Sequence, residues 1–120
     1  SDVVFEPGGT YVSEFPISNL SEFDVWYRIS FTNVSGELKD YVTVKVKEEN
    51  GIVLCDGLIS KLTKGDVSTG SLSAGEEKKL MIEFYFLKNV GNNYQGKTVT
   101  FNIKADATQK QNNSVKDFGD

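Results

Sequence analysis

The side chains that most often carry acid–base and metal chemistry are scarce in this 120-residue chain, which contains no histidine and one cysteine, Cys55. Histidine is the commonest general base and the main nitrogen ligand of zinc. Without it, Cys55 has no imidazole to deprotonate its thiol, and a two-histidine zinc site cannot form. We therefore read Cys55 as a small apolar core residue. The sequence predicts a protein that is not an enzyme, with no catalytic residue, no cofactor and no metal site.

Two pairs of adjacent glutamates, Glu48-Glu49 and Glu76-Glu77, are the remaining candidates for acid–base chemistry. Neighbouring residues of a strand point to opposite faces of its sheet, so neither pair converges on one point. We expect these carboxylates to be solvated surface charges. Calcium-binding loops and glycine-rich phosphate loops are absent from the sequence.

One short segment, Val25-Trp26-Tyr27-Arg28, holds the only tryptophan and the only arginine of the chain. On a strand, Trp26 and Arg28 share a face, so local stacking of the two side chains is the simpler account. The alternative is a carbohydrate- or peptide-binding surface with Trp26 and Tyr94 as ligand contacts.

The charge balance argues against nucleic acid as a partner, because 13 basic residues face 17 acidic ones and the net charge is −4. An acidic surface repels the phosphate backbone. The apolar runs are also too short for a membrane span.

Apolar and polar residues alternate with a period of two along four segments, 23–31, 41–48, 80–86 and 98–104. This alternation is the signature of strands that bury one face. It predicts a core that contains Val25, Tyr27, Ile29, Val42, Val44, Leu80, Ile82, Phe84, Val99, Phe101 and Ile103.

Turn signals divide the rest of the chain. Asn50-Gly51 and Asp56-Gly57 are both suited to tight hairpins, so we expect a three-stranded meander over 41–62. Pro7-Gly8-Gly9 separates a short strand at 3–5 from a strand at 10–17. Pro16 cannot donate to a sheet ladder, so 10–17 is expected to be an edge strand or to end there. Residues 63–74 are rich in Gly, Ser and Thr and read as a loop.

Roughly seven short strands without a long helix predict an all-β fold, a two-layer antiparallel β-sandwich. The Cys-Trp-Cys pattern of immunoglobulin domains is absent, which favours a jelly roll over an immunoglobulin-like topology. We place a single domain at residues 1–109 and interpret 110–120 as a polar, flexible tail.

Three stretches go beyond a generic sandwich. They are Phe5-Glu6-Pro7-Gly8 followed by 15–19 and 23–29, then Val53-Leu54-Cys55-Asp56-Gly57-Leu58, and finally Gly91-Asn92-Asn93-Tyr94-Gln95-Gly96 leading to Ala105-Asp106-Ala107-Thr108-Gln109. In this order, over residues 5–109, they resemble the TasA/camelysin family of exported biofilm matrix fibre proteins of Gram-positive bacteria, including the clostridial biofilm-surface members.

The resemblance implies a secreted jelly-roll protein of the extracellular matrix or cell surface, whose partners are copies of itself and other matrix or cell-wall components. In such fibres a strand of one subunit inserts into a groove of the next, which is strand addition. The family was once linked to metalloprotease activity, which a chain without histidine does not support. Family members carry a longer segment before the proline–glycine turn, so the donor segment is expected to be absent or truncated here. The assembly edge expected from this is Val3, Val4, Phe5, Tyr11, Phe15 and Ile17.

Two functions therefore stay open at the level of sequence. The first is a structural fibre subunit that assembles by donor-strand addition. The second is a surface adhesin or carbohydrate-binding module that uses Trp26 and Tyr94.

Overall fold

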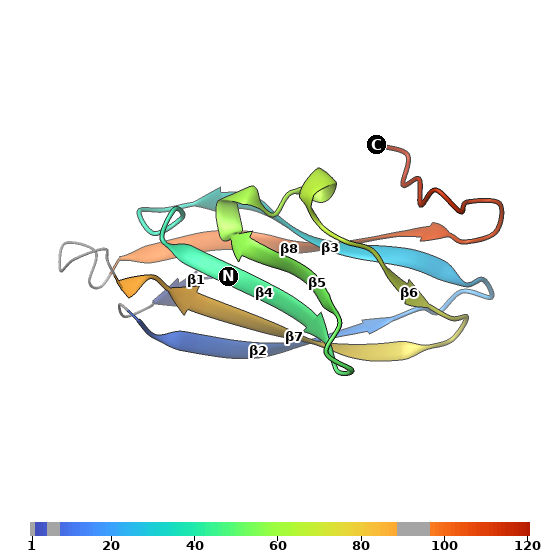
Figure 1. The fold of residues 1–120 in the computed structure, drawn as a ribbon, viewed down its shortest axis with the longest axis horizontal. Coiled ribbons are helices and arrows are strands. Elements are labelled where there is room, and N and C mark those ends of the chain that lie inside the picture. The colour runs from blue at the N-terminus through green and yellow to red at the C-terminus, as the bar shows by residue number, and fades with distance from the viewer. Residues whose placement is uncertain (1, 5–7, 89–96) are drawn as a thin grey trace.

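The computed structural model describes residues 2–4, 8–88 and 97–120, which form two antiparallel sheets packed face to face (Figure 1). Sheet A has the order β1-β8-β3-β6 and sheet B the order β2-β7-β4-β5. The strands are β1 (Asp2–Val4), β2 (Thr10–Ser18), β3 (Val25–Ser35), β4 (Val42–Glu48), β5 (Val53–Leu58), β6 (Gly70–Leu72), β7 (Glu77–Phe86) and β8 (Thr98–Gln109). The two-layer antiparallel β-sandwich expected from the sequence is confirmed.

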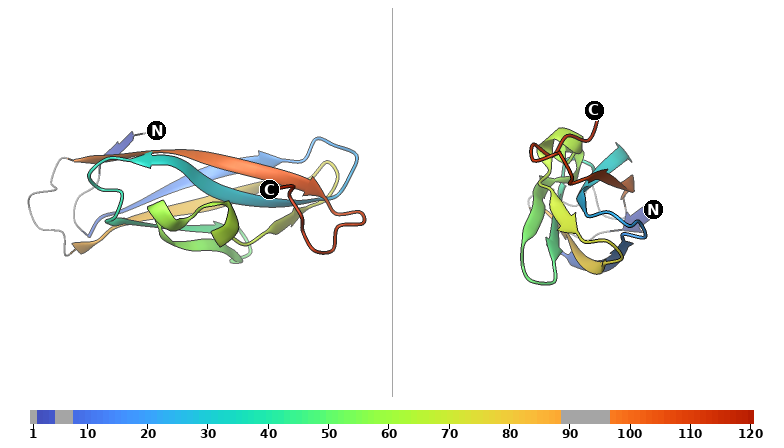
Figure 2. Two further views of the ribbon diagram at one scale, coloured as in Figure 1. Left: turned by 90° about the horizontal axis from the view of Figure 1, so that it is seen from above. Right: turned by 90° about the vertical axis from the view of Figure 1, so that its right-hand side faces the viewer.

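The strands run along the length of the molecule, which measures 51 × 26 × 20 Å (Figures 1 and 2). Consecutive strands lie in different sheets, with the exception of the β4–β5 hairpin. Two 3₁₀ helices, η1 (Ile59–Lys61) and η2 (Lys64–Asp66), connect β5 to β6. None of the helices in the described part of the chain has the length and apolar character that a membrane crossing requires.

The core lies between the sheets and is built from the alternate side chains of each strand. Every residue that periodicity assigns to the core is buried except Ile103, which is partly buried and packs against it. Phenylalanine rings of the two sheets contact one another in this core: the Phe84 ring centroid of β7 lies 5.4 Å from that of Phe101 on β8 and 6.5 Å from that of Phe31 on β3. One-sided burial therefore explains the period of two in the sequence.

The expected meander over 41–62 is wrong in its second half. Asn50-Gly51 does form the β4–β5 turn, with Gly51 at a φ of 94°. Asp56-Gly57, by contrast, lies inside β5 and pairs with Lys45 and Val44 of β4. The dipeptide permits a tight turn without requiring one, and here the ladder to β4 continues through it.

The segment after β5 is helical rather than a third strand. Ile59 and Leu62 are both buried, and a spacing of three residues suits a 3₁₀ turn, which brings residues i and i+3 onto one side. The stretch 63–74, expected to be a loop, also contains η2 and the short strand β6.

The two N-terminal strands lie at sheet edges. Among the described residues β2 pairs with β7 alone, so the edge position inferred from Pro16 is confirmed. β1 pairs with β8 at three positions, with Val3 opposite Val99. Phe5 lies outside the described residues.

Gly70 gives a direct test of core packing, because a Cβ there would lie 2.5 Å from ring atoms of Tyr27. We predict that Gly70→Ala lowers the free energy of unfolding by about 1–3 kcal/mol through overpacking. Gly57→Ala is the matched control, since a Cβ there meets Leu62 Cδ2 at an ordinary 3.7 Å. Urea denaturation of both variants measures the difference, and equal stability of the two would contradict this packing.

Candidate functional site

The edge of sheet A is incompletely covered. β8 extends from Thr98 to Gln109, yet its partner β1 covers only Thr98–Thr100. Beyond Thr100, β8 pairs with β3 on one side and with no strand on the other among the described residues. An uncovered edge of this kind presents backbone donors and acceptors for pairing.

The side chains of β8 that point toward sheet B become smaller along this uncovered part of the strand. Ala107 is paired with Tyr27 and Ala105 with Ile29 of β3. Partners directly opposite each other in an antiparallel pair point to the same face. Because Tyr27 and Ile29 are buried between the sheets, Ala105 and Ala107 face the same layer. Both alanines are nevertheless exposed, so the layer is not filled there.

β2, the edge strand of sheet B, borders the same unfilled part of the layer between the sheets. Phe15 is paired with buried Leu80 of β7 and Ile17 with Lys78, so both side chains point toward sheet A. They are only half-buried, since no strand in the described part of the chain covers them from the β8 side. Tyr11 continues this row and is 49% exposed.

Together these side chains line an apolar groove between β2 and β8 with a volume of about 330 Å³. Its walls are Phe15 and Ile17 from β2 and the two alanines from β8. Tyr27 of β3 and Leu72 of β6 also line it. The groove therefore combines an uncovered backbone edge with an unfilled part of the core.

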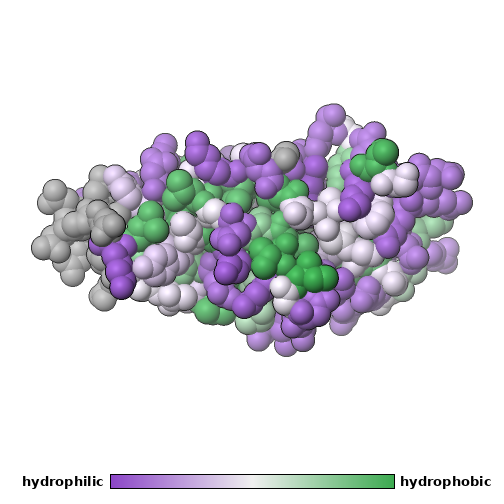
Figure 3. Space-filling model, viewed as in Figure 1, coloured by the Kyte–Doolittle hydropathy of each residue, from purple (hydrophilic) through white to green (hydrophobic). Residues whose placement is uncertain are grey.

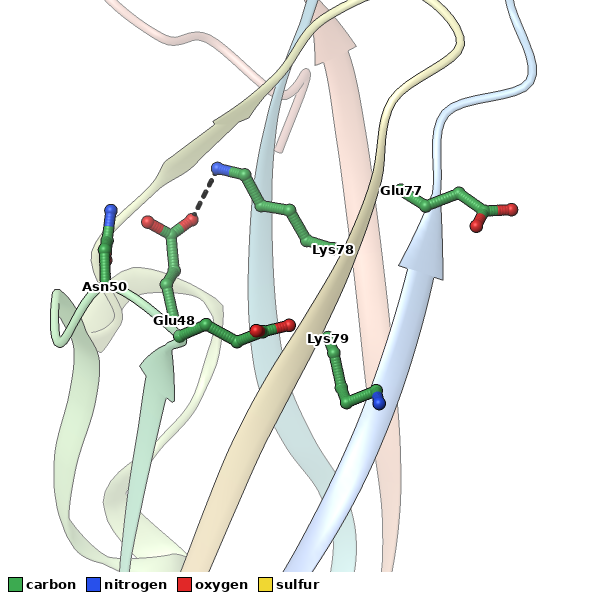
Figure 4. A pocket seen from close by; sticks show the side chains of 6 residues that line it. Glu48, Asn50, Glu77, Lys78 and Lys79 are labelled. Atoms are coloured by element: carbon green, nitrogen blue, oxygen red, sulfur yellow. Dashed lines mark hydrogen bonds and ion pairs between the residues drawn. The ribbon is translucent and has the colours of Figure 1, made fainter.

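A polar network that involves Tyr27 joins the two sheets next to the groove. The Tyr27 hydroxyl donates a hydrogen bond to Glu48 Oε2, and Lys78 Nζ lies 2.8 Å from the same oxygen. Figure 4 shows Lys78 reaching from β7 to Glu48 on β4. Lys78 Nζ also donates to the carbonyl oxygen of Ser71 in β6 at 2.6 Å. One carboxylate thus links strands of both sheets.

Glu48 is 5% exposed, so the expectation that it is a solvated surface charge is wrong. It follows Val42, Val44 and Val46 in the inward row of β4. Burial alone would raise the pKa of Glu48, but hydrogen bonds from Lys78 and Tyr27 outweigh burial and hold this pKa below its ordinary value. Burial, reinforced by the Glu48 carboxylate, raises the pKa of Tyr27. Glu48 is therefore an ionised acceptor and Tyr27 a protonated donor, which makes the network structural.

The structure brings together only part of the assembly edge expected from the sequence. Phe15 and Ile17 line the groove, whereas Tyr11 lies farther along β2, with its ring centroid 6.0 Å from that of Phe84. Val3 and Val4 belong to β1, which pairs with the start of β8. Sequence reasoning missed Ala105 and Ala107. The signal available was two small residues that continue the bulky row Val99, Phe101, Ile103.

The candidate ligand contact Trp26 lies beneath the C-terminal tail. Its Nε1 donates to the carbonyl oxygen of Asn113 at 2.9 Å. The ammonium groups of Lys110 and Lys116 lie 4.4 and 4.8 Å from the centroid of the Trp26 ring. The other expected contact, Tyr94, lies outside the described residues.

Arg28 contacts the same tail, residues 110–120. Its Nη2 lies 2.6 Å from Asp120 Oδ2, and its guanidinium carbon lies 4.2 Å from the centroid of the Phe118 ring. Asp106 of β8 contributes a second carboxylate at 3.4 Å. Arg28 thus stacks on the tail, where local stacking on Trp26 was expected.

The side chains considered for catalysis or metal binding do not form a site among the described residues. Burial raises the pKa of the Cys55 thiol to about 11, which keeps the thiol protonated and suits a packing role. Within the described residues, no three side chains of the His, Cys, Asp and Glu types gather in a way that could hold a metal ion.

Comparison with known proteins adds no relative: no protein-family model and no curated protein matches this chain.

The network around Glu48 predicts an acid-sensitive contribution to stability. Because the pKa of Glu48 lies below its ordinary value of 4.5, its contribution is complete above that pH and is lost as the pH falls through the lowered pKa. We expect Glu48→Gln to lower the free energy of unfolding at neutral pH by about 2–4 kcal/mol, since Lys78 loses its buried counter-charge.

Denaturation curves between neutral pH and acid measure this effect, with exposed Glu49→Gln as the matched control. The difference between wild type and Glu48→Gln should shrink below pH 4.5. A difference that is independent of pH would contradict the assignment.

Proposed function

We propose that this chain is a structural subunit of an extracellular biofilm or surface fibre. In this proposal, an extended segment of one copy adds as a strand beside β8 of the next copy. The observation that carries the proposal is the uncovered edge of β8 beyond Thr100, next to the apolar groove between β2 and β8.

The backbone supplies the first half of the interaction. β1 already pairs with β8 in antiparallel fashion at Thr98–Thr100, so the lateral position of an added strand is defined. A donor that continues from there would meet the edge of β8 from Phe101 to Gln109. Main-chain hydrogen bonds of this kind give affinity in strand addition.

Side chains supply the second half. Alternate residues of the donor would enter the layer between the sheets, where Ala105 and Ala107 leave room and Phe15 and Ile17 form the facing wall. Large apolar residues at every second donor position fit this space, and they would fix the register.

A second copy of the chain is the occupant that we propose, and the resemblance to TasA/camelysin fibre proteins supports this choice. A groove on one copy that receives a segment of the next forms a heterologous contact, which propagates into a filament. Self-association also protects an edge that soluble sandwiches otherwise cover.

The same proposal includes a jelly-roll topology, a secreted location and a role without catalysis. Eight strands in two sheets, with all but one connection crossing between the sheets, are typical of a jelly roll. The adhesin alternative has no comparable support, because Trp26 is engaged by the tail.

The test uses an extended peptide with large apolar residues at every second position, both free in solution and fused ahead of Ser1. We expect the peptide to raise the melting temperature of this chain, because it binds only the folded form. At a hundredfold excess over Kd, binding would raise the free energy of unfolding by about 2.7 kcal/mol. Ala105→Glu, which places a charge in the groove, should abolish the effect. Asn102→Glu is the matched control, because Asn102 is exposed and belongs to the opposite face of β8.

Electron microscopy of the protein extended by that segment completes the test. Fibres from wild type and Asn102→Glu, and none from Ala105→Glu, are expected. An unchanged melting temperature, or an extended protein that stays monomeric because its own segment fills the groove, would refute the fibre assignment.

A further inference from the structure

A second groove, with a volume of about 520 Å³, lies on the opposite margin of the sandwich. It is bounded by the end of β3, the β3–β4 turn and the two 3₁₀ helices. β6 pairs with β3 along Val25–Tyr27, so the groove borders a part of β3 that no strand of the described residues covers on this side. Figure 3 shows hydrophilic side chains along the margin where η1 and η2 lie.

Three lysines from separate elements converge on this groove: Lys39 from the β3–β4 turn, Lys61 from η1 and Lys64 from η2. Lys39 and Lys61 make no ion pair within the described residues. Lys64 has one carboxylate partner, Asp120, at 3.6 Å. Among the described residues, Asp40 is the one carboxylate that lines the groove with them. The groove is therefore locally positive on a chain whose net charge is −4.

The wall formed by β3 is irregular at this point. The register of β3 against β8 shifts between Thr32 and Ser35, and Asn33 has a positive φ of 53°. A bulge of this kind redirects side chains, and strained backbone of this kind is found preferentially at functional sites. Asn33 itself lines the groove and is exposed, so its amide is available as a hydrogen-bond donor.

The chemistry of the lining defines the class of ligand. Lysine binds phosphate as a point charge, whereas planar carboxylates are best matched by the fork of arginine, which this groove lacks. Phe31 is the one aromatic residue among the lining side chains and is 2% exposed, so it offers no platform for stacking bases. These features favour a phosphate-bearing chain without bases.

We infer that this groove binds a phosphodiester-linked polyol or sugar polymer, with Lys39, Lys61 and Lys64 contacting its phosphates. The inference does not depend on fibre assembly. This groove is lined by the end of β3, the β3–β4 turn and the two 3₁₀ helices, whereas the assembly groove lies between β2 and β8. A polymer could therefore stay bound while a donor strand occupies the other margin.

Titration of this chain with poly(glycerol phosphate), followed by NMR and calorimetry, tests the inference. We expect shifts confined to residues around the groove and an affinity that falls with salt, with a log–log slope of roughly −2 for three phosphate contacts. The triple variant Lys39→Gln, Lys61→Gln, Lys64→Gln should bind roughly 100-fold more weakly at about 0.1 M salt.

The matched control is Lys45→Gln, Lys79→Gln, Lys104→Gln, which changes the net charge equally on the outer faces of the sheets. It should bind the polymer as wild type does, and circular dichroism checks that both variants fold. If both triple variants lost the same affinity for the polymer, binding would depend on the overall charge of the protein alone, and the inference would be overturned. Equally tight binding of single-stranded DNA with the same number of phosphates would overturn the proposed ligand class.

Discussion

The fold depends on one constraint: the layer between the two sheets must be filled by the inward side chains of every strand. Packed sheets lie about 10 Å apart, so each inward row must meet its counterpart. β3, β4 and β7 satisfy this with valine, isoleucine, leucine and phenylalanine that are almost entirely buried. The layer is not filled at the margin between β2 and β8, because Ala105 and Ala107 are too small to reach the facing side chains of β2. An unfilled row beside an uncovered edge is the physical basis of the proposed assembly.

Near that margin, the two sheets are held together by the polar network around Glu48 in place of apolar side chains. Lys78 continues the inward row of β7, where another apolar residue would extend the core. Its charge is tolerated because Glu48 and the carbonyl of Ser71 receive its hydrogen bonds. Gly70 leaves the space that the Tyr27 ring needs to reach Glu48. Through Tyr27, this polar network borders the groove.

Periodicity was sufficient for the core and the sandwich, because one-sided burial requires alternation within each strand. It was insufficient wherever the outcome depends on pairing between distant segments. Asp56-Gly57 permits a turn, and only the ladder to β4 shows that the strand continues. Glu48 lies in the inward row of β4, but its counter-charge on β7 is invisible to local reasoning. The groove follows from the register of β8 against β3, and the tail contacts follow from Arg28 meeting Asp120.

Amide hydrogen exchange along β8 tests the central claim most directly. In the isolated chain, the amides between Phe101 and Gln109 that point away from β3 should exchange rapidly, whereas those bonded to β3 are protected. After assembly of the extended protein, the amides of β8 that point away from β3 should also become protected. Fibres that form while these amides keep exchanging rapidly would contradict strand addition at β8.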